Sequence, residues 1–357
     1  MERQAKKVRL TLSPQAERYV RQDAPRETRL MAARGALPLP PTELATVLFG
    51  LMHDPDPEVK STARDSLEGL PEAITTAVLS SPVHPALLSF FAEHHSGDAD
   101  RLELIALNAD ADDETIALLA ASPYKNIVEI ISNNQERMQR APEIVEALGS
   151  NPLTGRSVIE RILTFLGAEE IVDDLDGRSD AAAISDEEAE RALRAVLGDE
   201  MGQYTNELVE EPESEEEEVT SGNLFQLVQQ MTVFQKIQLG RMGNKEARGL
   251  LVRDRNKLVA IAVVTSPKIT DSEIITIAQS RNVCDEVLRT ISARNDWTRS
   301  YKVKLGLASN PKCPQAAAMK FVNYLQDQDL RALMRSRDIP RVISTHARRI
   351  LMKKGKI

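Results

Sequence analysis

The chain has 357 residues, of which 42% are hydrophobic, 28% are charged and 4% are aromatic, so most of it can bury a core built mainly from Leu, Ile, Val and Ala. The net charge of −9 is uneven: residues 169–218 hold twenty Asp or Glu against three Arg, whereas residues 297–357 hold fourteen Lys or Arg against three Asp. We expect a cytoplasmic protein without a secretory signal or a membrane span, because basic and polar residues follow Met1 and no apolar run approaches about 18 residues.

Residues 1–27 form a basic N-terminal segment, and from residue 28 short apolar runs recur at helical spacing. Turns in which Ser or Asn precedes Pro separate many of these runs. Proline disfavours the α conformation at the residue before it, and Ser and Asn tolerate turn geometry, so each such turn ends one helix. A new N-cap a few residues later begins the next. We therefore predict an all-α fold, with a first helical-repeat array over residues 28–168.

The turn marks recur in the second half of the chain, where Asn310 repeats the Ser-Asn-Pro setting of Asn151 at a distance of 159 residues. The matched marks lie near residues 108, 122, 134 and 151 in the first copy and near residues 266, 280, 295 and 310 in the second. We expect residues 98–166 to be duplicated as residues 256–325. Short helices with a period of about 14–15 residues are typical of a solenoid, in which each helix pair buries its apolar face only against its neighbours.

One of the turns resembles a known repeat family. Residues 53–67 read HDPDPEVKSTARDSL, which resembles the second helix of a HEAT repeat, where Asp-Pro-Asp-Pro opens a helix with Ala and Leu on its buried face. Lys60 stands where that family usually has Arg. The Asn-Pro turns elsewhere resemble the leucine-rich-repeat-variant class of short bacterial α-helical repeats. These resemblances imply an α-solenoid of short HEAT-like repeats in two arrays joined by an acidic linker, and a binding scaffold rather than any particular substrate.

Residues 169–221 interrupt the repeats. Their acidic composition cannot bury enough apolar surface to fold alone, so we expect a disordered linker between the two arrays. Within it, Ser185 and Glu188 have the spacing of a capping box and precede apolar residues that share one helical face. We predict a short amphipathic helix over residues 186–197, which is either solvated or packed on a partner or on the protein's own array.

Residues 222–357 are predicted to form the C-terminal array. Thr232 with Gln235, and Thr270 with Glu273, have the pattern of capping boxes. Residues 243–264 indicate a charged surface followed by a buried helix. The last helix is basic and is expected to cover the open end of the array, because terminal repeats need a polar outer face.

The candidate site is a set of basic residues on the last two helices and the tail. One interpretation is a solvated face on a capping helix. A second is a surface for an acidic protein partner, including this chain's own Glu215–Glu218 run. A third is a nucleic-acid surface that contacts phosphates, although the acidic chain and its few aromatic residues weigh against it. The candidate partner-binding residues are Arg331, Arg335, Arg337, Arg341, Arg348, Arg349, Lys353 and Lys354.

The sequence holds no recognisable catalytic constellation, because it lacks a Gly-rich phosphate loop and the H-E-x-x-H and G-x-S-x-G motifs. His94 and His95 are adjacent and would point apart on a helix, so we expect no metal site there. Cys284 and Cys313 are expected to be free thiols. We predict a non-enzymatic protein-binding scaffold or adaptor without a cofactor or small-molecule substrate. The alternatives are a nucleic-acid-binding HEAT-like protein and, more distantly, an enzyme of the HEAT-like lyase or glycosylase kind.

Overall fold

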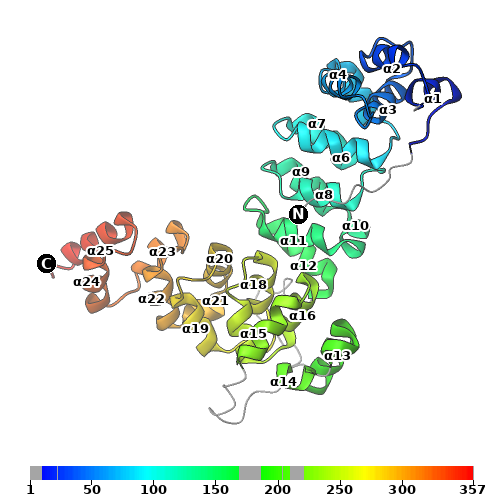
Figure 1. The fold of residues 1–357 in the computed structure, drawn as a ribbon. Coiled ribbons are helices and arrows are strands. Elements are labelled where there is room, and N and C mark those ends of the chain that lie inside the picture. The colour runs from blue at the N-terminus through cyan, green and yellow to red at the C-terminus, as the bar shows by residue number, and fades with distance from the viewer. Residues whose placement is uncertain (1–9, 22, 169–185, 203, 210–220, 357) are drawn as a thin grey trace. The chain divides into compact units, whose positions relative to one another are not determined.

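The computed structural model describes residues 10–21, 23–168, 186–202, 204–209 and 221–356, and every regular element within these ranges is a helix (Figure 1). This confirms the prediction of an all-α fold. The helices end where the sequence places turns. Proline at the first positions opens several of them, because its fixed φ suits a helix start and its missing N–H would have no intrahelical partner there.

The chain divides into two compact units, Met1–Thr154 and Gly155–Ile357. The first unit contains α1 (Pro14–Val20), α2 (Arg26–Ala33), α3 (Pro41–Leu51), α4 (Pro57–Glu68), α5 (Glu72–Leu79), α6 (Pro85–His94), α7 (Ala99–Leu107), α8 (Asp113–Ala120), α9 (Lys125–Ser132), α10 (Gln135–Arg140) and α11 (Pro142–Ser150). In this unit α3, α5, α7 and α9 pack in one row, each on the next, and α6, α8 and α11 pack in a second row.

The second unit begins with α12 (Arg156–Leu163) and a π-helical turn (Thr164–Ala168), which pack against α18 and α16 respectively. The array expected over residues 28–168 therefore extends past the first unit by these two elements. The remaining helices are α13 (Asp186–Gly202), α14 (Thr205–Val209), α15 (Ser221–Gln230), α16 (Val233–Met242), α17 (Lys245–Leu251), α18 (Lys257–Val264), α19 (Asp271–Gln279), α20 (Asp285–Ala293), α21 (Asn295–Arg299), α22 (Tyr301–Ser309), α23 (Gln315–Val322), α24 (Asp327–Arg335) and α25 (Arg341–Lys353).

The core of the second unit is built around α18. Every side chain from Leu258 to Val264 is buried, as expected for the helix that follows the charged stretch. In this unit α16, α18 and α20 form one row, whereas α19 packs on α22, and α22 on α23. Contacts of this kind bury the apolar faces between helices that are one to three elements apart along the chain.

Helix α13 lies within the segment expected to be a linker, residues 169–221. It begins at the predicted residue and extends five residues beyond the predicted end at 197. Its residues Ala189, Leu193 and Leu197 are buried, and the helix packs on α16 and α14. The amphipathic helix thus contacts the protein's own second unit. The other acidic parts of the expected linker, residues 169–185 and 210–220, lie outside the described residues.

Six helices of the first half recur in the second half: α7–α12 correspond in order to α18–α23. Their first residues are 158 to 160 positions apart, from Ala99 against Lys257 to Arg156 against Gln315. Corresponding helices also make corresponding contacts, since α7 packs on α9 as α18 packs on α20, and α8 packs on α11 as α19 packs on α22. The helix positions therefore agree with the duplication expected from the turn marks.

In three places the asparagine that directly follows a helix bonds to the end of an earlier helix, the one on which its own helix packs: α7 on α5, α11 on α8, and α22 on α19. Its side-chain amide donates to two backbone carbonyls there, and its oxygen accepts a backbone N–H two residues on. The bonds run from Asn108 to the oxygens of Leu79 (2.7 Å) and Ser81 (3.0 Å), from Asn151 to those of Ala120 and Ser122 (2.8 Å each), and from Asn310 to those of Ala278 (2.9 Å) and Ser280 (2.8 Å). This asparagine bridge explains why the Ser-Asn-Pro turn is repeated, because it satisfies carbonyls at the end of a helix.

A second repeated turn was missed in the sequence. In the Asp-Pro-Asp-Pro turn, Asp54 accepts the N–H of Asp56, and Asp56 caps α4 by accepting the N–H of Glu58, both at 2.9 Å. Two hundred residues later, Asp254 accepts the N–H of Asn256 at 2.8 Å, and Asn256 caps α18. Each first aspartate also pairs with a cation from an earlier helix, Arg29 at 2.9 Å and Lys236 at 3.3 Å respectively.

Candidate functional site

The last two helices form a pair that presents the predicted basic residues. Helices α24 and α25 pack on one another, and α25 also packs on α23 (Figure 1). On α25, Ile343, Ala347 and Leu351 are buried, and their spacing of four residues puts them on one face of the helix. The opposite face of α25 is therefore held toward solvent by the packing of this apolar stripe.

All eight predicted residues are exposed in the structure. Arg331 and Arg335 lie on α24, Arg337 lies in the connection, and Lys354 follows α25 directly. Four more lie along α25 itself: Arg341, Arg348, Arg349 and Lys353. The structure thus places the whole predicted set on two adjoining helices and their ends.

The acidic side chains of this region all have internal partners. Asp327 pairs with Lys354 at 2.9 Å and with Lys356, and hydrogen bonds from Lys356 and Lys354 lower the pKa of Asp327 to about 2. Asp329 accepts a hydrogen bond from the Tyr301 hydroxyl, and Asp338 pairs with Arg281 at 3.0 Å. These three are the only Asp or Glu in residues 297–357.

The cations of the candidate set fall into two groups. Lys354 is engaged by Asp327, and Arg331 donates to the carbonyl oxygen of Lys356 at 3.4 Å. The other six make no ion pair with any described residue: Arg335, Arg337, Arg341, Arg348, Arg349 and Lys353. The surface therefore carries a surplus of positive charge whose nearby acids are already in use.

Exposed apolar side chains accompany these cations. On α25, Val342 is 47% exposed and Met352 is 52% exposed, and Tyr324, after α23, is 60% exposed. The Lys304 ammonium lies 5.3 Å from the centre of the Tyr324 ring, a cation–π arrangement. Sequence reasoning places Val342 among the apolar residues that recur at helical spacing in the last helix, and the structure instead exposes it. It did not single out Met352 or Tyr324, because an isolated apolar residue is ordinarily assigned to the core.

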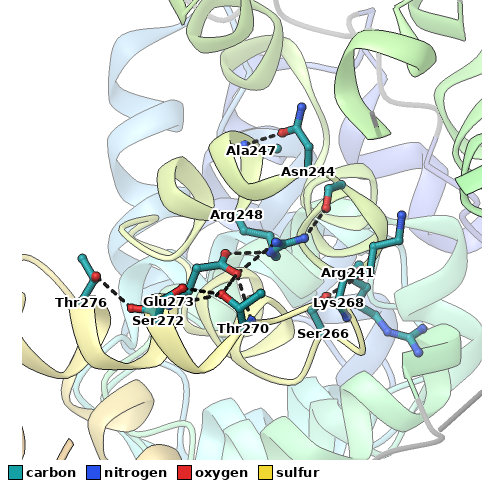
Figure 2. Close-up of polar contacts among 11 residues, drawn as sticks. Arg241, Asn244, Ala247, Arg248, Ser266, Lys268, Thr270, Ser272, Glu273 and Thr276 are labelled. Atoms are coloured by element: carbon teal, nitrogen blue, oxygen red, sulfur yellow. Dashed lines mark hydrogen bonds and ion pairs between the residues drawn. The ribbon is translucent and has the colours of Figure 1, made fainter. Parts of the chain in front are cut away.

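A second polar cluster lies between α17 and α19 (Figure 2). Arg248 belongs to the stretch expected to form a charged surface, but only 1% of it is exposed, so that expectation is wrong at this residue. Its guanidinium donates to both carboxylate oxygens of Glu273, at 2.9 and 3.0 Å, and to the Gly243 carbonyl at 2.7 Å. Figure 2 shows these groups pointing toward one another from separate elements.

Glu273 also belongs to the predicted capping box, which is confirmed. It accepts the N–H and the hydroxyl hydrogen of Thr270, at 2.9 and 2.8 Å. Burial by itself would raise the pKa of Glu273, but the hydrogen bonds from Arg248 and Thr270 outweigh burial, so the pKa lies below its ordinary value. The cluster is a closed network that joins helices, and its donors and acceptors are used within the protein.

The cysteine and histidine residues show no reactive arrangement among the described residues. Burial raises the pKa of the Cys313 thiol to about 11, so the thiol is protonated at neutral pH. His94 stacks on Phe90 with ring centroids 4.0 Å apart, and His95 contacts Arg101. Within the described ranges, no three His, Cys, Asp or Glu side chains are placed so that they could hold a metal ion.

Among the described helices, none combines the length and the apolar character that crossing a bilayer requires. Comparison of the chain with protein-family models, with curated proteins and with solved structures finds no match.

Proposed function

We propose that the protein is a non-enzymatic scaffold or adaptor, built as an α-solenoid, that binds a protein partner through the basic end of its second unit. The solenoid proposal is supported by helices that pack in rows on their neighbours and by asparagine bridges that repeat along each row. Such repeats form extended, preformed surfaces, which bind with a small ordering cost.

The observation that carries the functional proposal is the unpaired charge on α24 and α25. Six exposed cations have no acidic partner among the described residues, while Asp327, Asp329 and Asp338 each have internal contacts. Charged groups of one sign on a surface attract complementary partners and speed association. An acidic protein surface is the complement that these helices lack.

A nucleic acid is the second candidate, and one observation favours it. Tyr324 is an exposed aromatic ring close to the Lys304 ammonium, and exposed aromatic rings beside cations can stack on bases. The small number of aromatic residues, 4% of the chain, opposes this candidate, because binding of single strands by stacking uses several exposed rings on successive bases.

Capture from native lysate on the immobilised full-length protein tests the proposal, with and without nuclease and at two salt concentrations. We expect a defined protein to be retained after nuclease treatment, and to be lost when Arg341, Arg348 and Arg349 are all changed to Glu. The control changes Arg34, Lys60 and Lys125 of the first unit to Glu, which alters the net charge equally. Retention of the same protein by the α25 variant would contradict the proposed site. Retention that nuclease abolishes and that falls steeply with salt would favour nucleic acid instead.

A further inference from the structure

The exposed face of α25 combines apolar and basic side chains in one stripe. Val342, His346, Arg349 and Lys353 follow one another at spacings of four, three and four residues, which places them along one side of the helix. Met352 is exposed beside the basic end of this stripe. The stripe therefore begins with an apolar side chain and ends with cations.

A hydrogen bond joins this stripe to the end of α23. His346 Nε2 lies 3.0 Å from Asn323 Oδ1, and Tyr324 is the next residue in the chain. The contact therefore places the Tyr324 turn beside the middle of the stripe, with Val342 one helical turn away on one side of His346 and Arg349 one turn away on the other. Val342 and Tyr324, two half-exposed apolar side chains from different elements, thus border the same stripe.

On this basis we infer that the α25 face and Tyr324 form a binding site for a short acidic segment of a partner protein that also carries an apolar side chain. This inference rests on the proposed function. Arg349, on the stripe, and the exposed Arg348, which precedes it in the chain and lies beside the stripe, would pair with carboxylates, since guanidinium groups match carboxylate geometry with two parallel hydrogen bonds. Val342 and Tyr324 would bury the partner's apolar side chain, which is favourable in proportion to the apolar area removed from water.

The charge argues for an acidic segment, and the apolar residues argue for a protein. The surface has a surplus of unpaired cations, so its complement carries several carboxylates or phosphates. Phosphate contacts are electrostatic and independent of apolar side chains, and they give no role to Val342. A peptide with both kinds of side chain uses all of the exposed groups of the stripe.

The test is fluorescence anisotropy of labelled probes on the full-length protein at physiological salt. The probes are the peptide EELEEFEE, its apolar-free counterpart EESEESEE, and a short oligodeoxythymidylate. We expect EELEEFEE to bind about tenfold more tightly than EESEESEE, which corresponds to about 1.4 kcal/mol. We expect the Val342→Ser/Tyr324→Ser variant to lose this preference while still binding both peptides weakly.

Matched controls separate the apolar from the basic contribution. Leu107→Ser removes a side chain that is 62% exposed in the first unit, and it should leave both peptide affinities unchanged. Arg348→Glu/Arg349→Glu should abolish binding of both peptides. Because all of these positions are exposed, the variants should fold, and a thermal unfolding curve of each variant checks this.

Several outcomes would overturn the inference. Equal binding of the two peptides would remove the apolar site, and tighter binding of the oligodeoxythymidylate would assign the surface to nucleic acid. A several-fold gain in peptide affinity when Glu215–Glu218 are all changed to Gln would show that the chain's own acidic run is the occupant, rather than a separate partner. Protein capture that survives Val342→Ser/Tyr324→Ser but is lost with Arg348→Glu/Arg349→Glu would refute this inference and leave the proposed function standing. Capture unaffected by either variant would refute both.

Discussion

Replacing Arg248 with Met removes the cation of the buried pair and keeps a side chain of comparable length. The Glu273 carboxylate would stay buried with only the N–H and hydroxyl of Thr270 as donors, and the Gly243 carbonyl would lose its donor. Breaking a buried ion pair by removing one partner costs about 3–5 kcal/mol. Since Thr270 still satisfies part of the carboxylate, we expect Arg248→Met to lower the free energy of unfolding by about 3 kcal/mol.

Urea unfolding followed by tryptophan fluorescence measures this loss. Trp297 is the single tryptophan of the chain and lies in α21 of the second unit, so it reports on the unit that holds Arg248 and Glu273. The control Arg281→Met removes a pair with Asp338 whose side chains are 60% and 61% exposed. Exposed pairs contribute up to about 1 kcal/mol, so this control should unfold close to the wild type.

A double-mutant cycle decides whether the pair itself is responsible. We expect the variant with both Arg248→Met and Glu273→Met to be less destabilised than the sum of the two single variants, because neither charge is then left alone in the interior. If the losses of unfolding free energy of the two single variants simply add in the double variant, the interaction between Arg248 and Glu273 is refuted. A cost for Arg248→Met as small as that for Arg281→Met would refute the burial of the network.

Three further predictions concern single side chains of the second unit. Asn310→Ala should lower the free energy of unfolding by about 1–3 kcal/mol, because two carbonyls lose their donor, whereas Asn282→Ala at an exposed position should have little effect in the same urea titration. In a Cys284→Ser background, Cys313 should react with a disulfide reagent at pH 8 at least a hundredfold more slowly than an ordinary thiol. The reason is that its pKa of about 11 lies about two pKa units above that of an ordinary thiol, so less of the reactive thiolate is present. Unfolding the protein in urea should remove the difference. The folded-state pKa of Glu273 is lowered, so its contribution to the free energy of unfolding is present above the ordinary value of 4.5 and is lost as pH falls through the folded-state pKa. The difference in unfolding free energy between the wild type and Glu273→Gln should therefore shrink on acidification below pH 4.5.

Much of the fold could be predicted because its turns depend on local chemistry. The order Ser-Asn-Pro ends a helix through effects that act within three residues, and the capping boxes at Thr232 and Thr270 span only four. The paired positions Asn151 and Asn310 were therefore recognisable as equivalent from the sequence. The predicted basic residues were also placed correctly on the surface, since a helix with a regular apolar stripe leaves its other positions exposed.

The parts that could not be predicted depend on contacts between distant residues. Arg248 stands among charged neighbours, and nothing local indicates that Glu273, twenty-five positions later, would receive its guanidinium in the interior. The same holds for Lys354, which lies in the basic set but pairs with Asp327 across the helix pair. Val342 belongs to the apolar residues that recur at helical spacing in the last helix, and only the packing of α25 showed that it faces outward.

The turns of this chain recur at two distances, 159 residues from Asn151 to Asn310 and 200 residues from Asp54 to Asp254, and a third helix cap relates the two. Asp98 caps α7 by accepting the N–H of Arg101, and it lies 42 positions after Asp56 and 158 positions before Asn256. The cap of α18 therefore corresponds to the cap of α4 at one distance and to the cap of α7 at the other. In the proposed solenoid this is expected, because each helix contacts only its neighbours and a chain can gain or lose a repeat without disturbing distant ones. Arg255 and Lys257 replace Pro55 and Pro57, the prolines that made the first of these turns recognisable. The cap and the preceding aspartate kept their roles, and these are the positions on which the turn's hydrogen bonds depend.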